Sequence, residues 1–282
     1  MPLVFVTLWS SAFITSKIII DNASPFISLS LRFGVVGLIL FIYFLCFSKN
    51  KKVSIKAFCN ASISGLLFHG FYLGGVFYAL SKGISASLIA LIVSLQPILT
   101  SILARIYLNE KLTRIQWLGV LLGFCGAFII ILSNLKEDLT LLALIAGLVG
   151  LISSSLGIIW QKRIIDELPL SANNFIQAFS AFIFYIIITF CFENYYINFT
   201  DSFFISMSWQ IFAVSLGAFL ILMWLLERNK ANQTSTLFFL ITPISALMAY
   251  FILDEQFSYL DFFGLFVSSI GVYIVAKYQS KI

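Results

Sequence analysis

A few ionisable side chains interrupt the long apolar stretches of this chain, and they are its first candidates for chemistry. Lys17, Arg32, His69 and Arg105 fall inside such stretches, whereas no Asp or Glu lies deep within one. A charge inside a membrane-spanning helix is costly and is a functional candidate by default. For the lysine and the two arginines, the alternative is that the side chain reaches the headgroups from near a helix end. Because these charges are positive, they favour neutral, zwitterionic or anionic ligands.

His69 is the only histidine of the chain. Imidazole exchanges a proton near neutral pH, so this side chain could couple a proton to another event. Tyr72 lies three residues later and shares the same face of a helix, so the pair predicts a polar patch that faces a cavity. The alternative is a structural histidine, because the neutral ring needs only one donor and one acceptor as partners.

Two prolines stand in the interiors of predicted helices, each directly after a polar residue. They are Pro97 after Gln96 and Pro243 after Thr242. Proline removes a backbone hydrogen bond and kinks a helix, and membranes tolerate the freed carbonyls where protein or a water-filled cavity covers them. The functional interpretation is that both helices break at a central cavity and offer polar groups to a ligand. The alternative is a packing kink whose polar neighbour is bonded internally.

The composition places these residues in an integral membrane protein. Hydrophobic residues make up 61% of the chain and charged residues 10%, with a mean hydropathy of +1.04. Charged residues make up roughly 25% of soluble domains, and a membrane-spanning helix needs about 20 apolar residues. Ten such stretches are predicted, at residues 3–20, 26–47, 57–80, 85–107, 114–133, 139–160, 170–192, 207–226, 231–253 and 259–277. Little chain remains outside them, which excludes a separate soluble catalytic or nucleic-acid-binding domain.

The second half of the chain repeats the first at a displacement of 145 residues. The repeated positions include Ser10 with Ser155, Lys17 with Lys162, Asp21 with Asp166, Glu110 with Glu255 and Gly126 with Gly271. Each half contains five apolar segments, so the second copy enters the bilayer in the opposite orientation, an architecture found in many secondary transporters. The predicted fold is therefore all-α, with ten transmembrane helices in two inverted five-helix repeats, residues 1–137 and 138–282.

Basic residues of the predicted loops lie mainly on one side of the bilayer. If the N-terminus is inside, this side holds Lys49, Lys51, Lys52, Lys56, Lys111, Arg114, Lys162, Arg163, Arg228, Lys230, Lys277 and Lys281. The outside loops then hold only Lys82 and Lys136. Cytoplasmic loops are enriched in lysine and arginine, so we expect both termini in the cytoplasm. This arrangement accounts for the net charge of +5 without a nucleic-acid partner.

Small residues four positions apart indicate where two membrane helices pack closely. Gly119 and Gly123 have this spacing in the fifth apolar segment, and Gly264 and Ser268 occupy the equivalent positions in the tenth. These two helices are predicted to be partners, either within one chain or across a homodimer.

Glu110 and Glu255 follow the fourth and ninth apolar segments, in equivalent short turns between helices. We expect each carboxylate to accept hydrogen bonds from backbone donors at the start of a helix, where the helix dipole favours negative charge. This structural role is favoured over a shared ligand site, because inversion places the two residues on opposite faces of the membrane.

Several stretches, taken in order, resemble the EamA family of the drug/metabolite transporter superfamily. They are Leu8 to Phe13 with Lys17, Ser24-Pro25, Leu31 to Phe33, Ser85 to Leu88, Gln96-Pro97, Leu108 to Leu112, Gly119 to Gly126, Thr242-Pro243, Leu253 to Glu255 and Gly264 to Gly271. The resemblance implies ten helices in two inverted repeats and the export or uptake of small metabolites. It does not imply one substrate, because members of the family carry very different ones.

Aromatic side chains on the helices that surround the family's cavity are candidates for its wall. Trp9, Trp160 and Trp224 lie on such helices, and Phe13 could add to an apolar wall of the kind that binding pockets share. The chain has 31 Phe, so any one aromatic residue could instead face lipid or pack against a helix. The full set of expected cavity residues is Trp9, Phe13, Lys17, His69, Tyr72, Gln96, Trp160, Trp224 and Thr242, with Pro97 and Pro243 as the points of bending or gating.

These observations predict a secondary active transporter that moves an amino acid or a related zwitterionic or anionic metabolite by alternating access. We expect an exporter in a bacterial inner (plasma) membrane, as a monomer or homodimer, without cofactor or metal. No phosphate-binding loop is present, so a proton or substrate gradient would drive it. An enzyme is not expected, because His69 has no acidic partner at its depth. The alternatives are a lipid scramblase or a non-transporting membrane scaffold on the same fold.

Overall fold

The computed structural model describes residues 2–48, 53–108, 113–134, 140–164, 167–228, 238–256 and 258–278. Within these ranges the chain is helical and contains no β-strand. The elements are α1 (Pro2–Asn22), α2 (Pro25–Phe47), α3 (Ile55–Gly65), η1 (Leu66–Phe71), α4 (Tyr72–Ser81), α5 (Ala86–Ser94), α6 (Gln96–Leu108), α7 (Arg114–Asn134), α8 (Leu141–Ile164), α9 (Leu170–Phe192), α10 (Asp201–Trp209), η2 (Gln210–Ala218), α11 (Phe219–Arg228), α13 (Phe238–Leu253) and α14 (Tyr259–Lys277).

The prediction of an all-α integral membrane protein is confirmed. Seven helical runs of the described residues are long and apolar enough to cross a membrane, and further apolar helices are shorter. The count of ten transmembrane helices stays a prediction. Most predicted segments match the observed helices closely, because the length of an apolar stretch is set by the thickness of the bilayer.

One boundary was wrong. The eighth segment was expected to begin at residue 207, after a long loop that included Phe203 and Phe204, but α10 begins at Asp201. Thr200 caps this helix, since its hydroxyl oxygen accepts a hydrogen bond from the Phe203 nitrogen at 3.2 Å. Threonine is a preferred N-cap residue. The helix therefore starts two turns earlier than its strongly apolar part, and Phe203 is buried in the core.

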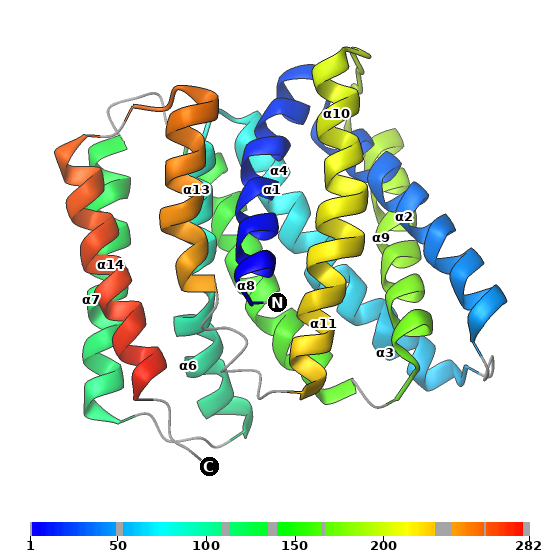
Figure 1. Ribbon diagram of the computed structural model, residues 1–282, viewed down its shortest axis with the longest axis horizontal. Helices are drawn as coiled ribbons and strands as arrows, with labels where there is room; N and C mark the ends of the chain where they lie inside the picture. The colour runs from blue at the N-terminus through cyan, green and yellow to red at the C-terminus, as the bar shows by residue number, and fades with distance from the viewer. Residues whose placement is uncertain are drawn as a thin grey trace.

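Helices at equivalent positions of the two halves pack against each other. The α2–α9 pair stands at one end of the bundle and the α7–α14 pair at the other end, while α1, α4, α8 and α13 lie between them (Figure 1). Residues 25–47 and 170–192, which form α2 and α9, differ by the displacement of 145. The same displacement relates α7 to α14. The packing thus follows the internal repeat.

Glycines hold α7 and α14 in close contact within one chain. A β-carbon on Gly126 would collide with the backbone of Gly264 and Ser268, and one on Gly271 would collide with the backbone of Gly119 and Gly123. Side chains at these positions would force the helices apart, as expected for small residues at a membrane helix crossing. The predicted partnership of these two helices is confirmed, and it lies within the protomer.

Two helices contain a π-helical segment in their middle, at equivalent places in the repeat. The segment η1 separates α3 from α4, and η2 separates α10 from α11. A π-helical turn widens the helix and is frequent at functional sites. Nothing in the hydropathy of these segments predicts the widening.

The two prolines interrupt their helices differently. Pro97 is the second residue of α6, directly after a break at Leu95 that separates this helix from α5. Pro243 lies inside the continuous helix α13. Two equivalent serines anchor these regions: the Ser155 hydroxyl donates to the Gln96 carbonyl at 3.4 Å, and the Ser10 hydroxyl donates to the Ile241 carbonyl at 3.2 Å.

Candidate functional site

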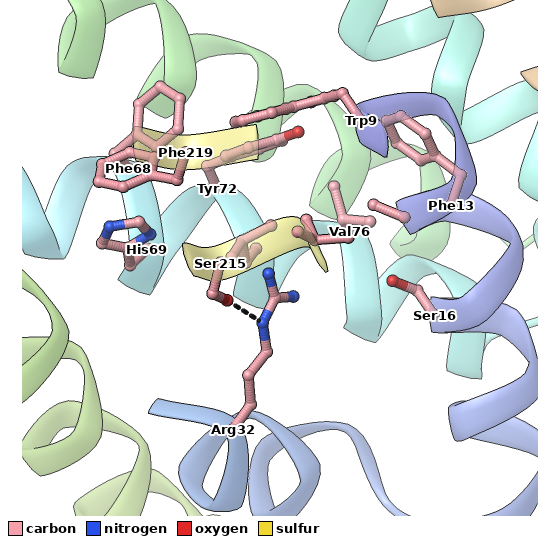
Figure 2. A pocket seen from close by; sticks show the side chains of 13 residues that line it. Trp9, Phe13, Ser16, Arg32, Phe68, His69, Tyr72, Val76, Ser215 and Phe219 are labelled. Carbon is pink, nitrogen blue, oxygen red and sulfur yellow. Dashed lines mark hydrogen bonds between the residues drawn. The ribbon is translucent and has the colours of Figure 1, made fainter. Parts of the chain in front are cut away.

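A buried pocket lies between α1, α2, the η1–α4 segment and the η2–α11 segment (Figure 2). The first three elements come from the first half of the chain, and the last comes from the second half. The space at its centre that is open to water is about 30 Å³, which is enough for about two water molecules. Its lining consists of Trp9, Ala12, Phe13, Ser16, Arg32, Phe68, His69, Tyr72, Leu73, Val76, Val214, Ser215 and Phe219.

Arg32 is the charged residue of this lining. It is only 4% exposed, in the second turn of α2, and its Nε donates a hydrogen bond to the Ser215 hydroxyl at 2.8 Å. Figure 2 shows the two terminal nitrogens of the guanidinium directed toward the middle of the lining side chains. Among the described residues, no Asp or Glu forms an ion pair with Arg32. The ion pair that is found in this part of the chain joins Lys17 to Asp21.

The π-helical segment η2 holds the polar end of the pocket in place. Ser215 lies within it, and Gln210 at its start ties it to α1. The Gln210 amide nitrogen donates to the Ala12 carbonyl and the Thr15 hydroxyl, each at 2.8 Å, and to the Ser16 hydroxyl at 2.9 Å. These bonds fix α1 and η2 to each other beside Arg32.

Aromatic rings form the other side of the pocket. The His69 ring lies 4.4 Å from Phe219 and 4.9 Å from Phe33 between ring centroids, and Trp9 lies 6.0 Å from Phe68. No hydrogen bond of the His69 side chain is found within the described part of the chain. The Tyr72 ring packs edge-on against Phe68, with 5.4 Å between the ring centroids. The site therefore combines one cation, a few hydroxyl groups and a large apolar wall.

Tyr185 of α9 supports the π-helical turn that carries His69. Its hydroxyl oxygen lies 2.6 Å from the carbonyl oxygens of both His69 and Gly70. The wider turn displaces backbone bonds from the usual α-helical pattern, as in the bond from the Tyr72 nitrogen to the Leu67 carbonyl. The hydroxyl therefore compensates for backbone acceptors that the π-helix leaves without a regular partner.

The structure brings together four of the cavity residues expected from the sequence. Trp9, Phe13, His69 and Tyr72 line the pocket. Their positions on α1 and on the η1–α4 segment explain this grouping, because these elements pack against each other at the centre of the bundle.

The other expected residues lie outside the lining. Lys17 forms an ion pair with Asp21 at 2.6 Å, and Trp160 donates to the Asn60 carbonyl at 3.1 Å. Trp224 is 37% exposed. Gln96 and Thr242 are buried beside their prolines, Pro97 and Pro243. The Gln96 side-chain nitrogen donates to the Ser154 carbonyl at 3.2 Å, whereas its oxygen and the Thr242 hydroxyl have no partner among the described residues.

Several lining residues were not singled out from the sequence. The charge of Arg32 makes it a candidate, but it is not among the expected cavity residues, and no sequence pattern indicates Ser16, Ser215 or Phe219. Arg32 and Ser215 are 183 positions apart, and no local pattern joins two such residues. The Arg105 side chain lies outside the described part.

The two halves carry unlike residues at equivalent positions of the pocket. At the displacement of 145, His69 corresponds to Val214, and both line the pocket. Arg32 corresponds to Gln177, which is fully buried and donates to Gln161 at 2.7 Å and to Asn173 at 3.0 Å. The repeat therefore places a cation in the first half where the second half carries a neutral amide cluster.

A helical membrane bundle with an internal sequence repeat and a pocket between its halves is typical of a membrane transporter. The family model of the EamA-like transporter family matches residues 1–132 and 141–277. The chain belongs to the EamA-like transporter family, and it is a multi-pass integral membrane transporter.

Individual relatives are distant in sequence. A probable amino-acid metabolite efflux pump of Escherichia coli (strain K12) is 23% identical, over 97% of this chain and 93% of that protein. The uncharacterized transporter YvbV of Bacillus subtilis (strain 168) is 24% identical, over 89% and 82% respectively. The uncharacterized transporter YyaM of the same organism is 26% identical, and the match spans 64% of this chain but only 61% of that relative.

A solved crystal structure shares the fold. It superposes with a TM-score of 0.70 at 15% sequence identity, over 97% of this chain and 94% of that one. At this identity the likeness concerns the arrangement of helices and not the ligand.

Proposed function

We propose that this protein is a secondary active transporter that exports a small metabolite, an amino acid or a related zwitterionic or anionic compound, by alternating access. One observation carries the proposal: a buried pocket with a cationic end and an apolar wall lies where the two halves meet. A site shared by two halves opens to one face or the other when the halves rock against each other.

The size of the pocket supports a conformational change. Ligand pockets commonly have volumes of about 300–1,000 Å³, whereas the open space here is about 30 Å³. A metabolite can therefore enter only after the lining helices move apart. The π-helical segments that contain His69 and Ser215 are suited to such movement, because both contribute residues to the lining of the pocket.

Export is proposed from the names of two relatives, and the orientation in the membrane is proposed from the positions of the basic residues. Two relatives carry the name amino-acid metabolite efflux pump, and the basic loop residues favour cytoplasmic termini in a bacterial inner membrane. The sequence contains no phosphate-binding loop, so a proton or substrate gradient is the proposed source of energy.

Counterflow in proteoliposomes tests the proposal. The purified full chain is reconstituted, vesicles are loaded with one unlabelled metabolite of a panel, and entry of the labelled compound is followed against protein-free vesicles. Accumulation that requires the internal compound supports a transporter. A correctly inserted protein that moves none of the compounds, but equilibrates fluorescent lipids between leaflets, would instead support a scramblase.

A further inference from the structure

We infer that the pocket selects small apolar monocarboxylates, and that Arg32 binds the carboxylate while the aromatic wall holds the apolar body. The inference rests on the proposed function and narrows its substrate class. It excludes the zwitterionic α-amino acids as preferred ligands.

The first step is that the buried Arg32 guanidinium lacks a carboxylate partner among the described residues. Burial of a charge is costly unless the charge is paired, and this guanidinium has no carboxylate partner among the described residues. Ser215 occupies only its Nε edge, so the terminal nitrogens that face the pocket in Figure 2 stay available. Guanidinium groups bind carboxylates through two parallel N–H donors. A carboxylate in the pocket would supply both the missing charge and the missing acceptors.

The second step is the number of charges. The described lining contains one arginine, one histidine and neither Lys, Asp nor Glu. The His69 ring is buried among aromatic rings, an environment that favours the neutral imidazole, so the arginine supplies the charge. One guanidinium neutralises one negative charge, so a doubly charged phosphate ester would keep an uncompensated charge in the pocket. An ammonium group would also lack an anionic partner, and an unpaired charge is the more costly the deeper it is buried. The net charge that fits is therefore minus one.

The third step is the apolar wall. Trp9, Phe13, Phe68 and Phe219 surround the side of the pocket away from Arg32 (Figure 2). The other polar side chains of the lining are Ser16, which accepts from Gln210, Ser215, which is bonded to Arg32, and Tyr72 and His69, which lie among the aromatic rings. The wall thus favours a ligand with a mainly apolar alkyl or aryl body.

A matched set of phenyl compounds tests this selectivity, because they share one ring and differ in charge. They are 3-phenylpropionate, phenylalanine, phenethylamine and phenyl phosphate. Binding is measured at neutral pH, through the ligand-induced rise in unfolding temperature of the full chain in a neutral detergent. We expect the apparent Kd of 3-phenylpropionate to be at least about tenfold below that of phenylalanine, since an unpaired buried ammonium is penalised. We expect no measurable binding of phenethylamine. Equal or tighter binding of phenylalanine, phenethylamine or phenyl phosphate would overturn the inference.

Substitutions of Arg32 assign the effect to one group. Arg32→Gln should weaken the binding of 3-phenylpropionate at least about tenfold, without lowering the unfolding temperature of the ligand-free protein, because it removes a buried charge that has no carboxylate partner among the described residues. Arg32→Lys should bind weakly but keep the preference for the anion, since it retains the charge and loses the planar fork. Lys17→Gln is the matched control: this cation is outside the lining and already paired with Asp21, so binding should not change. Unchanged binding in Arg32→Gln would contradict the assignment.

Counterflow with the same compounds separates this inference from the proposed function. If 3-phenylpropionate binds through Arg32 but is not transported, the proposed function as a transporter is contradicted and the inferred carboxylate site is supported. If phenylalanine or phenethylamine is moved and 3-phenylpropionate neither binds nor moves, transport stands and the carboxylate site fails.

Discussion

The Glu255 carboxylate caps the N-terminus of α5, where one of its oxygens accepts a hydrogen bond from the backbone nitrogen of Ala86 at 2.7 Å. Its other oxygen accepts from the Ser87 nitrogen at 3.2 Å and from the Ser87 hydroxyl at 2.5 Å. Glu255 follows α13 in the second half, whereas α5 belongs to the first half. The expected structural role of this carboxylate at a helix start is confirmed, and it joins the two halves. Glu110, its counterpart in the repeat, lies outside the described residues.

Removal of this carboxylate should destabilise the contact between α13 and α5. We expect Glu255→Ala to cost about 1–2 kcal/mol, as for other lost helix caps. Each kcal/mol corresponds to roughly 2–4 °C in unfolding temperature for a chain of at least 150 residues. The measurement is thermal unfolding of the purified protein in detergent.

Asp254→Asn is the matched control for that measurement. Asp254 is exposed directly before Glu255, with a positive φ of 53°, and asparagine tolerates this backbone conformation. The control removes one negative charge from the same turn and should leave the unfolding temperature unchanged. Equal losses in the two variants would show that net charge of the turn, and not the cap on α5, sets stability here.

A second carboxylate cap gives a pH-dependent prediction. Glu193, directly after α9, accepts from the backbone nitrogens of Phe26 and Ile27 at 3.1 and 3.0 Å, at the start of α2. Burial raises the pKa of Glu193 above its ordinary value of 4.5, and the two backbone donors oppose the shift only in part. The folded state therefore holds this proton more tightly than the unfolded state does. The contribution of Glu193 to stability is greatest below pH 4.5 and declines as the pH rises through the raised pKa.

Glu193→Gln removes the titration but keeps one acceptor oxygen. The unfolding temperature of this variant relative to the unsubstituted protein should therefore rise between about pH 4.5 and neutral pH, the range over which the carboxyl loses its proton. A series of thermal unfolding curves across this range provides the test. A difference that stays constant, or that falls with rising pH, would mean that the backbone donors outweigh the burial of the carboxylate.

The glycine contact between α7 and α14 predicts a large effect from a small substitution. Gly271→Ala places a β-carbon against the backbone of Gly119 and Gly123, where no flexible side chain can move aside. We expect a loss of about 1–3 kcal/mol, the usual cost of overpacking, in thermal unfolding of the detergent-solubilised protein.

Gly37→Ala is the corresponding control, on α2. The nearest atom to its added β-carbon is the Phe179 nitrogen at 3.7 Å, which is an ordinary contact. Alanine is favoured over glycine in a helix by about 1 kcal/mol, so this variant should be as stable as the original protein or more stable. A comparable loss at both positions would indicate that helix crossings in this bundle are sensitive to any added methyl group.

The extent of the helices could be predicted from the sequence, whereas the composition of the pocket could be predicted only in part. Hydropathy determines where a helix crosses the bilayer, and the glycine spacing identified the α7–α14 contact. The start of α10 was missed because Thr200 and Asp201, a capping pair, precede the strongly apolar residues. The capping residues Thr200 and Asp201 do indicate a helix start, but hydropathy alone places the start of the helix later.

The pocket depends on contacts that no local pattern contains. Arg32 is bonded to Ser215, which lies in the π-helical segment η2, and a widened turn has no recognisable signature in a uniformly apolar segment. Trp224 and Lys17 lie on helices that border the pocket, but they point to other surroundings. His69 and Val214, which are unlike residues at equivalent positions of the repeat, both line the pocket.

Tyr185→Phe tests whether the π-helical turn at His69 depends on one hydroxyl group. The substitution leaves the carbonyl oxygens of His69 and Gly70 without the hydroxyl that lies 2.6 Å from each. An unsatisfied buried acceptor costs about 1–3 kcal/mol, so the unfolding temperature should fall, and counterflow should fall with it because His69 loses its support. Tyr78→Phe is the control, since the Tyr78 hydroxyl has no hydrogen bond to another described residue and its ring stacks on the same Phe26 ring as Tyr185 does. Reduced stability with full transport activity would show that the hydroxyl stabilises the fold without positioning the pocket.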